Sequence, residues 1–132
     1  SIRDLGLRDA VIELIQSYGI LQEPVINLMI YAAAEEKKIK MDKKIVLYRV
    51  LQELINNTLK YAKAGVIEIE FLIKNKTIIL KYTDNGKGFD AEKVKKGAGL
   101  NSINSRIQFH KGSMKLTSAP GAGTQIVVTM PI

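Results

Sequence analysis

The sequence contains no cysteine, and no run of apolar residues in it approaches the roughly 18 that are needed to cross a bilayer. Without cysteine there is no disulfide bond and no thiolate metal site, which fits a reducing compartment but only weakly indicates one. No signal peptide is visible. These absences exclude a disulfide scaffold and a membrane span within this stretch of chain.

Positive charge, by contrast, is in excess: 20 Lys and Arg stand against 13 Asp and Glu, a net charge of +7. Such an excess can serve nucleic acid, a membrane surface or a polyphosphate ligand. The basic residues are scattered, with small clusters only at residues 37–38, 43–44 and 93–96, so a solvated surface explains most of them. With three Phe and no recognised nucleic-acid motif, we expect no nucleic-acid partner and no membrane contact by this piece.

Three segments repeat apolar residues at helical spacing, which predicts helices over residues 7–18, from 41 or 42 to 62, and over 100–109. Asp42 is the expected N-cap of the long helix, and Gly112 is expected to end the last one. On the long helix the apolar side chains share one arc. They are Leu47, Leu51, Leu54, Ile55, Leu59 and Ala62.

Five segments are predicted to be strands: a buried one over 25–32, then 66–73, 77–83, 114–119 and 124–130. Asn75-Lys76 is expected to turn the second into the third. Residues 34–44 are expected to form a solvated loop, and 89–98 a short mobile lid. Mostly antiparallel strands with helices gathered on one face give an α+β fold, a two-layer α/β sandwich with a mixed sheet.

The polar face of the long helix combines Glu53, Asn57 and Lys60, with Arg49 and Asn56 beside them. Asparagine is a poor helix former, costing several tenths of a kcal/mol against Ala, roughly, so something other than local propensity retains the pair. An amide oxygen on a helix can bind Mg²⁺, which takes oxygen ligands and usually keeps waters and substrate phosphates. A merely solvated face remains the alternative.

Glycines recur after a carboxylate at the end of an apolar strand, in the stretches 84–90 (DNGKGFD) and 97–100 (GAGL). Glycine adopts positive φ and lets backbone N–H groups approach a ligand. Glycine-rich turns of this kind can hold phosphate oxygens. Two flexible surface turns would show the same glycine pattern. The position of Asp84 at the strand end and the polar helix upstream favour a binding site instead.

Four segments in this order resemble the GHKL (Bergerat-fold) ATP-binding superfamily. They are Glu53–Ala62 (ELINNTLKYA) as its N box, Asp84–Phe89 (DNGKGF) as its G1 box, Gly97–Leu100 (GAGL) as its G2 box and Gly121–Thr124 (GAGT) as its final motif. The segments Leu47–Glu53 (LYRVLQE) and Leu5–Ala10 (LGLRDA) resemble the nitrate-sensor-like, short-lid subgroup of sensor histidine kinases. The resemblance covers residues 45–132 and, more weakly, the N-terminus.

The resemblance implies that ATP and Mg²⁺ bind here. Asp84 should accept a hydrogen bond from the adenine amino group, and Asn57 should bind Mg²⁺ that bridges the phosphates. The remaining residues implied to hold the nucleotide are Asn56, Lys60, Tyr61, Gly86, Gly88, Gly97, Gly99, Leu100 and Thr124. For Lys60 a solvated lysine, and for Tyr61 a core aromatic, would fit the sequence as well. Glu53 is implied to be catalytic with Asn57, by orienting Mg²⁺ or polarising the acceptor, with base catalysis left open.

The resemblance also implies partners. Residues 1–20 are expected to be a helical segment that follows a dimerisation domain absent from this sequence, and residues 21–132 the ATP-binding catalytic domain. The γ-phosphate would pass to a histidine on that missing domain and then to a response regulator, in the cytoplasmic part of a possibly membrane-anchored sensor. His110 is expected to be structural, so this piece should be unable to phosphorylate itself, and it should be monomeric because the dimerising helices are missing. An anti-sigma-factor-like serine kinase, or another GHKL ATPase, is the alternative.

Overall fold

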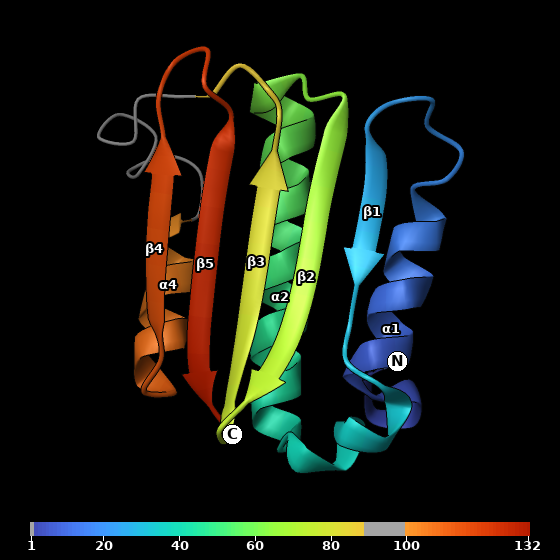
Figure 1. The fold of residues 1–132 in the computed structure, drawn as a ribbon, viewed down its shortest axis with the longest axis vertical. Coiled ribbons are helices and arrows are strands. Elements are labelled where there is room, and N and C mark those ends of the chain that lie inside the picture. Colours follow the sequence, from blue (N-terminus) through green and yellow to red (C-terminus); the bar gives the residue numbers. More distant parts are fainter. Residues whose placement is uncertain (1, 89–99) are drawn as a thin grey trace.

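A computed structural model of the chain describes residues 2–88 and 100–132, and it contains one five-stranded sheet with helices on one face (Figure 1). The strands lie in the order β1-β2-β3-β5-β4, with β1 parallel to β2 and every other pair antiparallel. The strands are β1 (Val25–Met29), β2 (Val66–Lys74), β3 (Thr77–Asp84), β4 (Ser113–Ser118) and β5 (Thr124–Pro131). The helices are α1 (Ile2–Ser17), η1 (Ala33–Lys38), α2 (Met41–Asn57), η2 (Thr58–Ala62) and α4 (Leu100–Phe109). The predicted α+β sandwich is confirmed.

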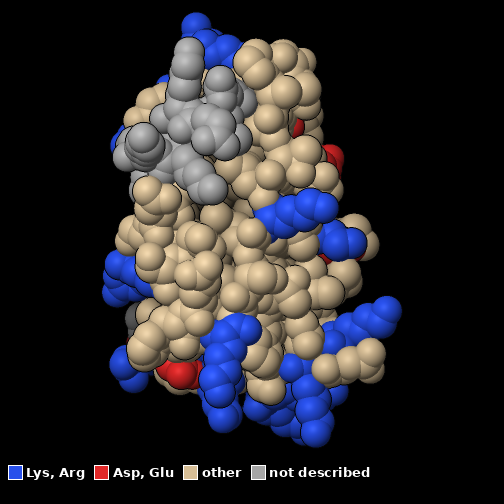
Figure 2. Space-filling model, turned by 90° about the vertical axis from the view of Figure 1, so that its left-hand side faces the viewer, with Lys and Arg blue, Asp and Glu red and all other residues tan. Residues whose placement is uncertain are grey.

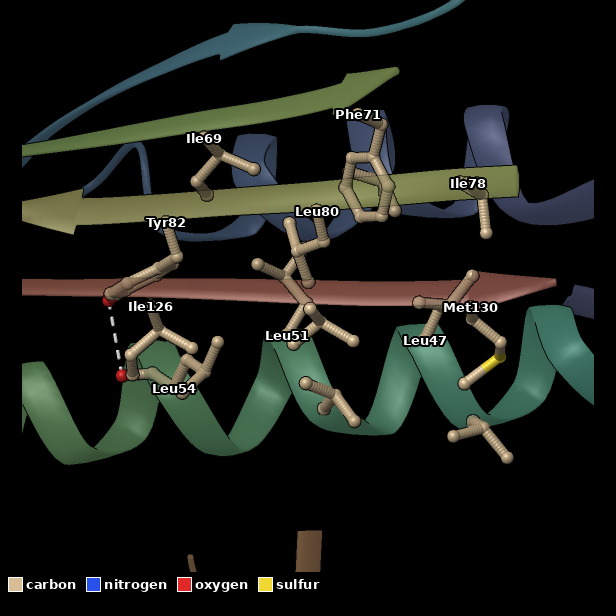
Figure 3. Packing of buried hydrophobic residues seen from close by; sticks show 14 of the residues in the cluster. Leu47, Leu51, Leu54, Ile69, Phe71, Ile78, Leu80, Tyr82, Ile126 and Met130 are labelled. Atoms are coloured by element: carbon tan, nitrogen blue, oxygen red, sulfur yellow. Dashed lines mark hydrogen bonds between the residues drawn. The ribbon is translucent and has the colours of Figure 1, made fainter. Parts of the chain in front are cut away.

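The core lies between α2 and the sheet. Figure 3 shows Leu47, Leu51 and Leu54 of α2 pointing toward side chains of β3 and β5. Each of these leucines is at most 1% exposed, and burying one leucine stabilises the fold by roughly 1.5–3 kcal/mol. Successive strand residues alternate between faces, so β3 turns Leu80, Tyr82 and then Asp84 toward the helices. The same alternation that builds the core therefore carries a carboxylate inward where the strand ends.

The hairpin between β2 and β3 forms as predicted. Asn75 and Lys76 adopt φ of +51° and +60°, the paired left-handed conformation of a two-residue hairpin turn. β1 differs from the prediction, because it ends at Met29 and is half exposed rather than buried, with Val25 and Met29 at 53% and 68% exposure. The reason is its position: β1 pairs only with β2 and forms the edge of the sheet.

The long helix differs from the prediction at both ends. Its N-cap position is Lys40, not Asp42, whose carboxylate accepts instead from the Lys43 N–H within the first turn. From Thr58 the α-helix widens into the π-helical turn η2. Leu59, four residues after the buried Ile55, is 37% exposed rather than in the core, because the wider turn breaks the 3.6-residue repeat that its predicted position assumed.

Residues 34–44 do not form the predicted solvated loop. They contain the 3₁₀ helix η1 and the start of α2, and their centre is Glu36. The Glu36 carboxylate pairs with Lys44 Nζ at 2.8 Å and accepts from the Tyr31 hydroxyl at 2.8 Å. It also accepts from the backbone N–H groups of Leu7 and Arg8, at 2.7 and 2.9 Å. Tertiary contact with α1 thus orders a segment whose own sequence reads as a loop.

The Glu36 contact explains a bend in α1. Gly6 has φ +80° and ψ 174°, so the helix restarts at Leu7, and Glu36 caps the exposed N–H groups of that second part. A Cβ on Gly6 would lie 2.9 Å from Glu36 Oε2. Leu7 and Val11, both fully buried, then join the main core. The predicted helix over 7–18 is thus the second part of a bent helix.

Lys and Arg side chains are unevenly distributed over one face of the molecule. Figure 2 shows the side of the molecule that carries β4 and α4, where Lys and Arg gather mainly at the lower end. The lower end in this view is the end at which β2 turns into β3, away from Asp84. Among the described residues on this face, Lys and Arg are therefore not concentrated at the end of the sheet where β3 ends on Asp84.

We expect Glu36→Gln to lower the free energy of unfolding by about 2–3 kcal/mol, because it removes charge-assisted hydrogen bonds and leaves Lys44 buried without its counter-ion. Burial alone would raise the pKa of Glu36, but hydrogen bonds from Lys44, Arg8, Leu7 and Tyr31 outweigh it, so the pKa lies below its ordinary value. A lowered pKa makes this stabilisation complete above the ordinary carboxyl range and lost as pH falls below it.

Urea unfolding at pH 7 and at several values below 4.5 measures both effects. The matched control is Glu35→Gln, the neighbouring carboxylate, whose surface pair with Lys38 is worth little. Equal stability of Glu36→Gln and wild type at pH 7 would contradict the capping role.

A second expectation concerns Gly6. Gly6→Ala should lower the melting temperature more than Gly121→Ala, although both glycines have φ +80°. A Cβ at Gly121 meets nothing within 4 Å, whereas at Gly6 it meets the pinned Glu36 carboxylate in a conformation open almost only to glycine. We expect a loss of about 1–3 kcal/mol at Gly6. Thermal unfolding by circular dichroism decides, and equal losses in the two variants would refute the steric argument.

Candidate functional site

A cavity opens where β3 ends and α2 passes into η2. Its empty volume is about 380 Å³ with the open mouth included. The walls are mostly apolar, with a few polar groups between them. The lining residues are Leu54, Asn57, Thr58, Tyr61, Ala62, Tyr82, Asp84, Leu100, Thr124 and Ile126.

The most polar group in the wall is the carboxylate of Asp84, which is 6% exposed. Its Oδ2 accepts from the Thr58 hydroxyl at 2.9 Å, and its Oδ1 accepts from the Gly86 N–H at 2.9 Å. A carboxylate offers about four lone-pair positions, and these two donors occupy two of them. Among the described residues Asp84 is thus held by two donors, and it can accept further hydrogen bonds from a ligand in the cavity.

Thr58 is a site residue that the sequence analysis missed. Its hydroxyl donates to Asp84 and also lies 2.6 Å from the hydroxyl of Tyr82, which is 3.1 Å from the Leu54 carbonyl oxygen (Figure 3). Burial chiefly, with the charge of Asp84 adding to it, raises the pKa of Tyr82 despite the opposing effect of the hydrogen bond between Tyr82 and Thr58. The sequence spacing could have identified Thr58, because it follows the buried Leu51 and Leu54 by seven and four residues and so lies on the apolar face of the helix.

The loop after Asp84 packs against the end of η2. The Lys87 N–H donates to the Ala62 carbonyl at 2.8 Å, and a Cβ on Gly86 would lie 2.5 Å from that same oxygen. The Asn85 side chain accepts from the N–H groups of Gly65 and Val66, both at 2.8 Å. Gly86 is therefore required because this loop and the helix end approach too closely for a side chain.

The closing hairpin between β4 and β5 contacts the same loop. Gly88 has φ +67°, and a Cβ there would lie 2.1 Å from the Ala119 carbonyl, while the Gly121 N–H donates to the Lys87 carbonyl. Gly123, with φ +73°, places its α-carbon against the backbone of Asp84, where a Cβ would be 2.5 Å from the carbonyl oxygen. These glycines hold three backbone segments together around one carboxylate.

Several of the predicted site residues meet in the cavity. Asn57 and Tyr61 line it from the helix side, Leu100 from the start of α4, and Thr124 from β5 beside Asp84. Tyr61 is 51% exposed, so it is not a core aromatic. Thr124 is buried, and its hydroxyl lies 3.1 Å from that of Ser118.

Other predicted residues lie elsewhere. Glu53 and Asn56 line a neighbouring hollow between α2 and α4, together with Arg49 and Arg106. Lys60 is exposed on η2. Gly97 and Gly99, like the lid expected over 89–98, lie outside the described residues. 

His110 lies far from the cavity. Its Nδ1 is 3.7 Å from Asp42 Oδ2, at the first turn of α2, whereas the cavity is at the last. Fifteen residues of helix separate Asp42 from Asn57, about 22 Å at 1.5 Å per residue. His110 therefore cannot exchange a group with a ligand in the cavity without a large rearrangement.

Two features are absent from the described residues. No group of three or more His, Asp or Glu side chains among residues 2–88 and 100–132 is arranged to hold a metal ion. In the same part of the chain no helix has the length and apolar character that crossing a membrane requires.

Known proteins resemble this chain in sequence and in fold. The family model described as histidine kinase-, DNA gyrase B- and HSP90-like ATPase matches residues 42–132. The chain is 34% identical over 128 residues to "Sensor histidine kinase LiaS" of Bacillus subtilis, which covers 96% of the chain and 34% of LiaS. It is 30% identical over 133 residues to "Sensor protein VraS" of Staphylococcus saprophyticus, covering 99% of the chain and 38% of VraS. The chain thus spans about a third of the length of these curated relatives.

Solved structures agree on the fold. The histidine kinase domain of a blue-light-activated kinase from Erythrobacter litoralis superposes with a TM-score of 0.74 at 14% identity, covering 90% of this chain and 56% of that one. The histidine kinase AdeS of Acinetobacter baumannii superposes with a TM-score of 0.71 at 19% identity, and the match covers 95% of this chain and 62% of the AdeS chain. Since the family model matches more than half of the sequence, the chain belongs to the histidine kinase-, DNA gyrase B- and HSP90-like ATPases.

Proposed function

We propose that this chain is the ATP-binding catalytic domain of a sensor histidine kinase. The observation that carries the proposal is the buried Asp84 carboxylate, held by two donors in the wall of a mostly apolar cavity. A purine base suits the apolar walls, and its exocyclic amino group can donate to an acceptor that is already fixed in place. A guanine carbonyl at the same position would face the carboxylate as a second acceptor, which is unfavourable. Asp84 would thereby select adenine.

The phosphates would extend from the base toward Asn57 and the start of α4. Asn57 offers an amide oxygen in the cavity wall, and such oxygens suit Mg²⁺, which in phosphate-transfer sites takes most of its ligands from water and phosphate. The lack of an acidic cage among the described residues fits that mode of binding. When bound, Mg²⁺ would neutralise phosphate charge. We assign Glu53 to orienting or polarising the reacting groups from the adjoining hollow, and Asn56, Lys60, Gly97 and Gly99 to the phosphate side.

The reaction would move the γ-phosphoryl group from ATP to a histidine nitrogen, with ADP as the leaving group. In such transfers the protein contributes mainly positioning and electrostatic stabilisation. The chain's own histidine cannot be the acceptor, since His110 lies one helix length from the cavity. We therefore propose that the acceptor belongs to a dimerisation domain of the parent protein, and that a response-regulator aspartate receives the group next.

The remaining assignments follow the same proposal. Residues 1–20 would connect the dimerisation domain to the catalytic domain of residues 21–132, and the link would be firm because Leu7 and Val11 share its core. The LYRVLQE segment at residues 47–53 supports the nitrate-sensor-like, short-lid subgroup. The sensor names of the two relatives support a cytoplasmic kinase portion. They also favour a histidine kinase over the alternative serine kinase, which would form a stable phosphoserine on a partner instead of acid-labile phosphohistidine.

The first test is nucleotide binding. We expect Asp84→Asn to weaken ADP binding about 10- to 100-fold, because the amide replaces a charged acceptor by a neutral one. Isothermal titration with ADP and Mg²⁺ measures the affinity, and unfolding curves check that the variant is folded. Asp9→Asn is the control, since Asp9 is an exposed carboxylate on α1 and not a cavity residue. Saturable binding by Asp84→Asn with wild-type affinity, or none by the wild type, would refute the proposal.

A second test concerns the metal. Chelation of Mg²⁺ should weaken ADP binding by the wild type about tenfold, since the amide oxygen and the phosphates lose the ion that joins them. Asn57→Ala should bind ADP equally weakly with and without Mg²⁺. Asn27→Ala, an exposed asparagine on β1, should retain the full Mg²⁺ effect. A Mg²⁺ effect in Asn57→Ala as large as in the wild type would remove Asn57 from the metal site.

A further inference from the structure

Two buried hydroxyl groups have no part in the function proposed so far. They belong to Thr58 and Tyr82, which are 4% and 1% exposed, and both line the cavity beside Asp84. We propose that Thr58, oriented by Tyr82, is a positioning residue that fixes the Asp84 carboxylate for recognition of a purine with an exocyclic amino group. This inference rests on the proposed binding of a nucleotide in the same cavity. It assigns part of the base specificity of that cavity to Thr58, in addition to Asp84.

The contacts form one continuous path. Tyr82 Oη lies 2.6 Å from Thr58 Oγ1, and Thr58 Oγ1 lies 2.9 Å from Asp84 Oδ2. All three side chains are at most 6% exposed, so water cannot readily replace any of these hydrogen bonds. The path also joins two elements, since Thr58 begins η2 while Tyr82 and Asp84 belong to β3.

The direction of the protons follows from the partners. Thr58 has one proton and gives it to Asp84, because an ionised carboxylate only accepts. The Thr58 oxygen then needs a donor, and Tyr82 is the hydroxyl in reach. The single Tyr82 proton has one other acceptor in reach, the Leu54 carbonyl, but at 3.1 Å this is the longer of the two contacts. Tyr82 can therefore donate toward Thr58, and Thr58 toward Asp84.

The consequence is a carboxylate whose plane is set from both sides. Thr58 holds Oδ2 and the Gly86 N–H holds Oδ1, so the remaining lone pairs have a defined direction. Without the Thr58 hydroxyl, the carboxylate would lose one of its two donors among the described residues, and it could turn about its Cβ–Cγ bond. An amino group on a bound base would then meet a poorly directed acceptor, whereas a base without that group would lose nothing.

The test compares two ligands on one set of variants. Affinities are measured by isothermal titration, with Mg²⁺, for ADP and for purine riboside 5′-diphosphate, which lacks the amino group. The wild type should prefer ADP. Thr58→Val, which keeps the shape and removes the hydroxyl, should weaken ADP binding about tenfold and change binding of the analogue less than about twofold. Thr58→Ser should restore the preference, and Tyr82→Phe should lower it in the same direction by a smaller factor.

The matched control is Thr83→Val. Thr83 precedes Asp84 in the chain, but its side chain is exposed on the opposite face of β3, so both affinities should remain those of the wild type. Equal weakening of both ligands in Thr58→Val would overturn the proposal, because a purely structural role affects them alike. If Thr58→Val does not fold, Tyr82→Phe decides, and an unchanged preference there would overturn it. A wild type that binds neither ligand would instead refute nucleotide binding itself.

Discussion

The structure depends on how a single buried carboxylate is satisfied. Asp84 ends a core-facing strand, and an unpaired charge at that depth would cost several kcal/mol, roughly. The Thr58 hydroxyl and the Gly86 N–H meet it from two sides. To supply them, the helix widens into η2 and the loop after β3 presses against the helix end, so close that only glycine fits. Glycine is therefore needed in these turns because the backbone segments pack closely around this carboxylate.

A comparison of two carboxylates separates a structural site from a functional one. Glu36, near the start of α2, accepts from four donors: Lys44, Tyr31 and the N–H groups of Leu7 and Arg8. Four donors match the capacity of a carboxylate, so nothing remains for a ligand. Asp84, near the other end of α2, accepts from two donors among the described residues and borders a cavity. The helix therefore has a fully paired carboxylate at one end and one with free capacity at the other.

The apolar core lies between these two ends and keeps them in place. Leu47, Leu51 and Leu54 bind the helix to the sheet along most of its length, so neither end can shift without disturbing the packing. Because the same sheet carries Asp84 and Thr124 on paired strands, the cavity wall moves with the core rather than independently. The likeness in fold to histidine kinase domains at 14% and 19% identity fits this view, since the arrangement survives extensive change of side chains.

Much of the fold could be read from periodicity. The alternation in β2 and β3, the apolar stripe of α2 and the Asn75-Lys76 turn are local patterns, and each appears in the structure where the sequence predicted it. The family also followed from motifs, because their residues and order are properties of the chain alone. The position of each motif residue relative to the cavity depends on tertiary packing and less on local sequence. Asn57, Tyr61, Asp84, Leu100 and Thr124 meet in one cavity, but the same motifs carry Glu53 and Asn56 to a separate hollow.

What the sequence determined by itself was therefore the order of elements, the face that each buries and the family to which the chain belongs. Only the tertiary structure decided that residues 34–44 are ordered, that Leu59 leaves the core, and that Thr58 completes the site. Each of these depends on a partner between 24 and 29 residues away along the chain, or on a helical turn that departs from 3.6 residues. Local propensity carries no information about such partners, because hydrogen bonds across the fold exist only after the core has brought the segments together.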